Sequence, residues 1–189
     1  HVAFKWLKDS RGNKGRKLKP YDTGYVELKN GERIPALLVR DAKDIRDYLS
    51  RNSGIRNIFV DELQFISGIY DLVFNLMPQG YRFYGTGLPR PFKRTGFGEV
   101  PALMCLADRI NMLNSYCVTC HDPATENQRM KVVGGRKAVP AHFRDPLVLV
   151  GGGKDNKARD YYEPRCMRHW ELPGEPKLRY KFPAYALSS

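Results

Sequence analysis

The stretch "NIFVDELQF", residues 57–65, is where the fold and a candidate site are first indicated. It opens with a short hydrophobic run that ends in two adjacent carboxylates, Asp61 and Glu62. A nearly continuous apolar run of this length is typical of a strand that is buried on both faces of a parallel sheet. Two acids directly after such a strand are unusual unless they have a function. The end of this strand is therefore a candidate site.

The flanking sequence alternates between strand and helix patterns from residue 34 to residue 113. Asn30-Gly31, between two extended segments, predicts a hairpin. The apolar residues of segment 2–8 have approximately helical spacing, which indicates a first helix. Further helices are expected at 41–52 with Asp41 as N-cap, at 67–80 and at 100–113 with Cys105 in the core, and a further strand at 81–88. The alternation predicts an α/β domain with a mainly parallel sheet and flanking helices.

Length and composition suit one domain with a small appended lobe. The chain has 189 residues, 42% of them hydrophobic. No apolar run reaches membrane-spanning length, so no membrane span is expected. After residue 114 the sequence is rich in turns, glycine and cysteine. We therefore predict an α/β core over 1–114, a small lobe over 115–172 and an extended arm over 173–189.

The net charge of +12 is concentrated at the two ends. Residues 1–20 carry seven Lys/Arg and one acid, and residues 129–189 carry thirteen and six, whereas residues 21–128 carry twelve and thirteen. Basic ends predict contact with an anionic partner such as RNA, an acidic protein or a lipid surface. The alternative is a basic surface that is only well solvated.

Two matched pairs of metal-ligating residues stand 46 positions apart. Cys117 and Cys120 form a C-x2-C pair, and Cys166 and His169 form a C-x2-H pair. Such a set is typical of a tetrahedral structural zinc, which would tie together the ends of the long segment 121–165. The alternatives are residues that never meet, or a redox dithiol at positions 117 and 120.

Four segments together resemble the type II thymidine kinases, the zinc-containing family that phosphorylates thymidine and deoxyuridine. They agree with the family in order and spacing from about residue 18 to residue 169. The segments are "DELQF" (61–65), "GTGLPRPFKRTGFGEVPALMCLAD" (85–108), "LNSYCVTCHDPATENQRM" (113–130) and "VGGGKDNKARDYYEPRCMRH" (150–169).

The resemblance implies roles for the two acids. Asp61 would hold Mg²⁺ through water, and Glu62 would be the general base that takes the proton of the nucleoside 5′-hydroxyl, with ATP as phosphoryl donor. The segment between the zinc pairs would be the family's lasso loop over the nucleoside. The residues that fall at the family's nucleoside-binding positions are Phe65, Leu88, Phe92, Phe97, Arg129 and Tyr162.

The chain also departs from the family's pattern at the chemistry. Its 189 residues contain no G-x-x-x-x-G-K-[ST] phosphate loop, and His1 falls just after the place where that loop would end. The family's D-T-R-Y reads with glycine at Gly24, and Leu63, His121 and Asn127 replace other family residues. Phosphoryl transfer depends on positioning and charge neutralisation, so we expect catalysis to be lost.

Two functions follow. The first is a non-catalytic thymidine-kinase-like subunit of a larger assembly, such as a mitochondrial ribonucleoprotein or membrane-enzyme complex, with residual nucleoside binding. Its partner would be contacted by Arg165, Arg168, Lys177, Arg179 and Lys181 at one end and by Lys14, Arg16 and Lys17 at the other. The alternative is an active, homotetrameric and cytoplasmic thymidine kinase whose phosphate loop lies upstream of His1.

Overall fold

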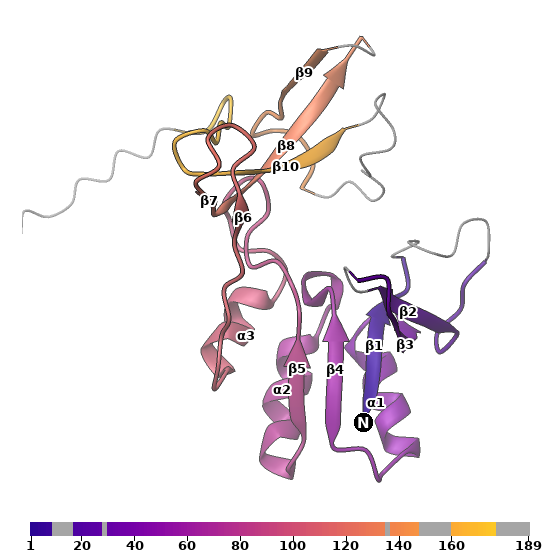
Figure 1. The fold of residues 1–189 in the computed structure, drawn as a ribbon. Helices are drawn as coiled ribbons and strands as arrows, with labels where there is room; N and C mark the ends of the chain where they lie inside the picture. Colours follow the sequence, from indigo (N-terminus) through magenta and orange to yellow (C-terminus); the bar gives the residue numbers. More distant parts are fainter. Residues whose placement is uncertain (9–16, 28–29, 135–136, 148–159, 177–189) are drawn as a thin grey trace, which may run out of the picture.

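A five-stranded sheet forms the centre of the first part of the chain (Figure 1). The computed structural model describes residues 1–8, 17–27, 30–134, 137–147 and 160–176. The strand order is β2-β3-β1-β4-β5; β1, β3, β4 and β5 are parallel, and β2 runs antiparallel to β3. The strands are β1 Val2–Trp6, β2 Thr23–Glu27, β3 Arg33–Val39, β4 Asn57–Asp61 and β5 Arg82–Gly85. The predicted α/β class with a mainly parallel sheet is confirmed.

The helices begin and end at residues with the expected chemistry. Asp41 caps α1 by accepting a hydrogen bond from the backbone N–H of Asp44 at 3.1 Å. The helix α2 continues into the short 3-10 turn η2, which ends at Gly80 with a left-handed φ of 84°. The helical segments are α1 Ala42–Arg51, η1 Leu63–Phe65, α2 Ile69–Leu76, η2 Met77–Gln79 and α3 Val100–Leu106.

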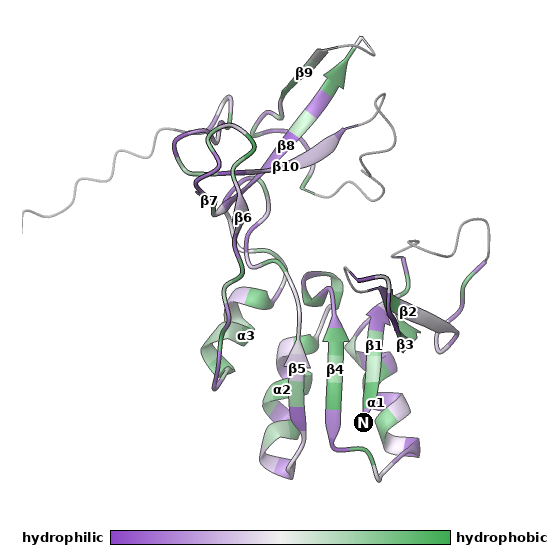
Figure 2. Cartoon of the chain, viewed as in Figure 1, coloured by the Kyte–Doolittle hydropathy of each residue, from purple (hydrophilic) through white to green (hydrophobic). Residues whose placement is uncertain are grey.

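The main core lies between the sheet and helices α1 and α2. Phe4 and Val60 are paired on neighbouring strands, and their buried side chains pack against Ile45 of α1 and Ile69 of α2. Figure 2 shows most of β4 in green, the hydrophobic colour, in agreement with the apolar run in the sequence.

The opposite face of the sheet is open within the described residues. Phe59 and Tyr84 are stacked there with ring centroids 4.8 Å apart, yet they remain 41% and 48% exposed. The face forms a groove of about 700 Å³ that is also lined by Ala3 and Ile34. The prediction that the strand in residues 57–65 is buried on both faces is therefore wrong for the part of the chain that the structure describes, because α1 and α2 cover the same face.

Two further expectations are wrong. Residues 2–6 form β1 instead of a helix, because Val2, Phe4 and Trp6 alternate with the period of a strand. The helix expected over 100–113 ends at Leu106, and Cys105 is exposed instead of lying in the core. The apolar residues that follow Leu106 are exposed, Leu113 to 92%, so packing does not stabilise a longer helix.

The second part of the chain is a lobe built on a three-stranded antiparallel sheet of order β10-β8-β9. Figure 2 shows β10 in pale and purple tones, and the lobe has two small clusters of buried side chains, one of Phe92, Ala141 and Leu172 and one of Cys117, Ala124 and Cys166. Among the described residues no helix is long and apolar enough to cross a membrane. The lobe's strands are β6 Ser115–Tyr116, β7 Pro123–Ala124, β8 Glu126–Val133, β9 Lys137–Pro140 and β10 Tyr161–Arg165.

Candidate active site and metal centre

The two acids of the opening stretch lie where β4 ends. Asp61 is the last residue of β4, and its carboxylate accepts a hydrogen bond from the hydroxyl of Thr86, just after β5. Because β4 and β5 are parallel, both residues lie at the carboxyl edge of the sheet, where ligands of α/β proteins bind. Sequence reasoning missed Thr86, since nothing in its local pattern marks it as a partner of an acid 25 positions away.

Glu62 is held in an uncommon conformation. Its φ of 57° and ψ of 48° are left-handed, a conformation that costs a non-glycine residue about 1–3 kcal/mol. The turn places its carboxylate 2.5 Å from the amide nitrogen of Gln64, which donates a hydrogen bond to it. The amide oxygen of Gln64 accepts a hydrogen bond from the backbone N–H of Leu88 at 3.0 Å. Gln64, only 6% exposed, therefore ties Glu62 to the segment after β5.

Three aromatic rings, those of Trp6, Phe65 and Phe97, pack together beside these carboxylates. The Phe65 ring stacks on Trp6 at 4.4 Å and meets the edge of Phe97 at 5.4 Å. Gly98 permits the close approach: its φ is +55°, and a Cβ there would lie 2.4 Å from the backbone oxygen of Gln64. The sequence-predicted residues Phe65, Leu88 and Phe97 are thus gathered around Gln64, with Leu88 44% exposed.

The other three predicted nucleoside-binding residues lie together in the lobe. Arg129 and Tyr162 are paired across β8 and β10, and Tyr162 packs against Phe92. The Arg129 guanidinium donates to the backbone oxygen of Pro146 at 2.6 Å and to Asp160 at 2.8 Å, and lies 5.4 Å from the Phe92 ring centroid. Phe92 is 1% exposed, so its ring is part of the lobe's core.

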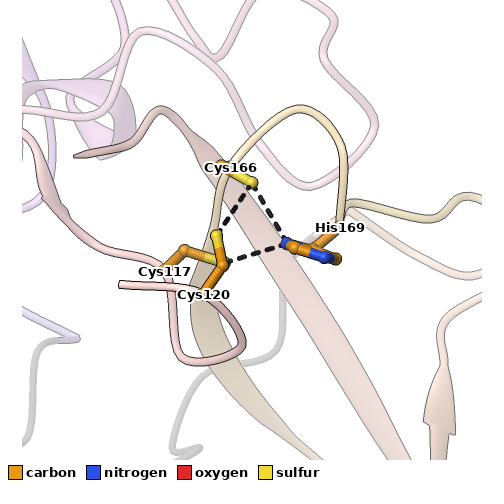
Figure 3. Close-up of side chains that lie close together, drawn as sticks. All are labelled: Cys117, Cys120, Cys166 and His169. Atoms are coloured by element: carbon orange, nitrogen blue, oxygen red, sulfur yellow. Dashed lines mark hydrogen bonds between the residues drawn. The ribbon is translucent and has the colours of Figure 1, made fainter. Parts of the chain in front are cut away.

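The four predicted metal ligands meet at one point (Figure 3). Their ligand atoms all lie within 4.8 Å of one another. Cys120 Sγ is 3.7 Å from Cys166 Sγ, and the Nδ1 atom of His169 is 3.3 Å from Cys166 Sγ and 3.7 Å from Cys117 Sγ. Zinc–sulfur bonds of about 2.3 Å in a tetrahedron separate neighbouring sulfurs by about 3.8 Å. The donor set and its spacing therefore fit a structural zinc.

The surroundings of the cluster lower the pKa of the Cys117 and Cys166 thiols, whereas burial and hydrogen bonds with those two cysteines raise the pKa of Cys120 to about 11. Burial would raise the pKa of Cys117, but hydrogen bonds from the backbone at Cys166, Thr119 and Cys120 and from His169 lower it to about 5. Hydrogen bonds to the two thiols raise the pKa of His169. His121, which follows the C-x2-C pair, is not part of the cluster.

Gly24, at the position of a family arginine, lies in β2 against Leu38. A Cβ at position 24 would lie 2.5 Å from Leu38 Cδ2, so a larger residue there would require the buried Leu38 side chain to shift.

The thymidine kinase family model matches residues 9–170 of the chain. The match includes both acids, the Phe65 and Phe97 rings, the four metal ligands and the segment between the two ligand pairs.

Proposed function

Because the chain belongs to the thymidine kinase family, we propose that it binds thymidine or deoxyuridine and transfers the γ-phosphoryl group of ATP to the nucleoside 5′-hydroxyl. The observation that carries the proposal is the arrangement of Asp61, Glu62 and Gln64 at the carboxyl edge of the sheet, beside the Phe65 and Phe97 rings. At this edge the Glu62 carboxylate is held in a fixed position, and the Phe65 and Phe97 rings offer an aromatic surface to a nucleobase.

Glu62 is the general base of the proposed reaction. It would accept the proton of the 5′-hydroxyl as that oxygen attacks phosphorus. Gln64 holds one carboxylate oxygen at 2.5 Å, and the left-handed turn fixes the direction of the side chain. Such positioning supplies much of the rate enhancement in phosphoryl transfer.

Asp61 and Thr86 are the oxygen groups of this edge that suit a Mg²⁺ ion and its waters. The ion, when bound with ATP, neutralises charge on the phosphates. Asp61 would hold the ion through water, and Thr86, whose hydroxyl donates a hydrogen bond to Asp61, would orient that carboxylate.

The sheet has room for a phosphate-binding segment. Within the described residues β5 pairs on one side only, and the face with Phe59 and Tyr84 is open. Parallel sheets are normally covered on both faces. By the right-handed crossover rule, a helix that entered β1 from the β5 side would cover this open face, and the turn before that helix would lie at the carboxyl edge near Asp61. The open face is therefore compatible with the kinase.

The second candidate is the non-catalytic subunit of a larger, possibly mitochondrial assembly, which the net charge of +12 supports. Of the residues expected to face its partner, Lys17 is exposed, Arg168 is 74% exposed and bonded to Asp122, and Arg165 is 19% exposed and bonded to Glu163 at 2.5 Å. Lys14, Arg16, Lys177, Arg179 and Lys181 lie outside the described residues.

Variant proteins separate the two candidates. The chain is expressed from its complete reading frame, and formation of thymidine monophosphate from ATP and thymidine is measured. Glu62→Gln should lower kcat at least about 100-fold, the usual contribution of a general base, with little change in thymidine affinity. Glu32→Gln, an exposed change outside the site, is the control. Absence of phosphorylation in the wild type, together with recovery of a larger salt-sensitive complex from native extract, would instead favour the assembly subunit.

A further inference from the structure

A buried carboxylate of the lobe holds the segment that follows β5. Glu126, the first residue of β8, has a side chain that is only 4% exposed. Its two oxygens lie 3.2 Å from Arg94 Nε and 3.7 Å from Arg90 Nη1. The Thr125 hydroxyl adds a hydrogen bond of 3.1 Å. A buried carboxylate is tolerated only with such partners, so Glu126 constrains both arginines.

Trp170 holds the same segment from a second side. Its indole N–H donates a hydrogen bond of 3.2 Å to the backbone oxygen of Phe92. The guanidinium of Arg94 lies 5.1 Å from the centroid of the Trp170 ring, within cation–π range. Arg94 adopts a left-handed φ of 59°, so the turn at this residue needs outside contacts to persist.

Glu126 and Trp170, the two side chains that hold this segment, are both close to metal ligands. Glu126 is paired across the sheet with Arg165, the residue before Cys166. Trp170 directly follows His169. A metal ion that holds Cys166 and His169 in place therefore also fixes the two side chains that hold the segment.

We propose that Glu126 is a positioning residue that couples the metal centre to segment 88–97. This segment carries Leu88 and Phe97, which lie around Gln64 and Phe65. When zinc is bound, the lobe holds the segment in the position that closes the nucleoside site. The consequence for the nucleoside rests on the proposed function, whereas the coupling itself does not.

Hydrogen exchange followed by mass spectrometry tests the coupling on the full chain. Peptides covering segment 88–97 are compared in wild type and Glu126→Gln, each with zinc and after chelation. In wild type, removal of zinc should speed exchange in this segment about tenfold. Zinc-loaded Glu126→Gln should show a similar increase, and removal of zinc from the variant should add less than about twofold.

Two further variants control for the change itself. Glu163→Gln makes the same substitution in the neighbouring strand, where Glu163 bonds Arg165 and no contact to Arg90 or Arg94 is described; its segment 88–97 should exchange like wild type. If Glu126→Gln does not fold, Arg94→Gln removes the same ion pair from a side chain that is 33% exposed and should reproduce the result.

Wild-type exchange in Glu126→Gln, or a full further tenfold increase when zinc is removed from the variant, would overturn the proposal. Thymidine binding is measured in parallel by calorimetry, and Glu126→Gln should weaken it about tenfold. If wild type does not bind thymidine, the proposed function fails, while the exchange data still decide the coupling.

Discussion

Replacing Phe92 by alanine should destabilise the lobe much more than the α/β sheet. The Phe92 side chain is 1% exposed and packs with Ala141 and Leu172, and partly with Phe143 and Tyr162. Removing a fully buried phenylalanine ring costs about 3–5 kcal/mol. This cluster has few buried members and can partly collapse into the space, so we expect about 3 kcal/mol, near the lower end of that range.

Urea unfolding measures this cost. The chain has two tryptophans, Trp6 in the sheet and Trp170 in the lobe. A Trp6→Phe background therefore leaves a fluorescence signal from the lobe alone. With a slope of about 1–3 kcal/mol/M, a loss of about 3 kcal/mol lowers the urea midpoint by about 1–3 M.

The matched control is Phe74→Ala in α2, because Phe74 is 56% exposed. It should cost less than about 1 kcal/mol. A Phe92→Ala midpoint within about 0.3 M of its background would mean that the ring is not part of a packed core.

Three other perturbations follow from the structure. Cys166→Ser should abolish zinc binding, measured by atomic absorption, and proteolysis should then cut segment 121–165 before the sheet; a first cut inside the sheet would count against this role for the metal. Gly98→Ala should destabilise by about 1–3 kcal/mol, because its Cβ would lie 2.4 Å from a backbone oxygen at left-handed φ, whereas Gly54→Ala meets nothing within 4 Å and should have little effect. Hydrogen bonds from Arg40 lower the pKa of Asp44. The ionised Asp44 therefore stabilises the fold at pH values above the unfolded-state pKa of about 3.9. This stabilisation is lost as the pH falls through the lower folded-state pKa. Asp44→Asn should therefore be less stable than wild type at pH 7 and approach it near pH 2, and an equal gap in thermal melts at both pH values would contradict this.

Local chemistry in the sequence was enough to predict several elements. Asp41 caps its helix, the Asn30-Gly31 pair lies between β2 and β3, and the apolar run before Asp61 forms β4. The two C-x2 pairs also meet as predicted. Each of these signals depends on residues within a few positions of one another, or on a ligand set whose chemistry allows few partners.

The errors have physical causes. A five-residue strand such as β1 is too short to distinguish a period of 2 from a period of 3.6, so Val2–Trp6 resembled a helix. The exposure of Phe59 and Cys105 depends on what packs against them, which no local pattern contains. The contacts of Glu126 with Arg90 and Arg94 join segments more than thirty residues apart, so only the fold brings them together.

The activity that we propose for this strand end is nucleoside phosphorylation. The most direct measurement is transfer of labelled γ-phosphate from ATP to thymidine by the zinc-loaded protein, expressed from its complete reading frame and assayed with Mg²⁺. We expect thymidine 5′-monophosphate from the wild type and loss of at least about 99% of the rate in Glu62→Gln. No labelled nucleotide from the wild type, or an unchanged rate in Glu62→Gln, would contradict this proposal.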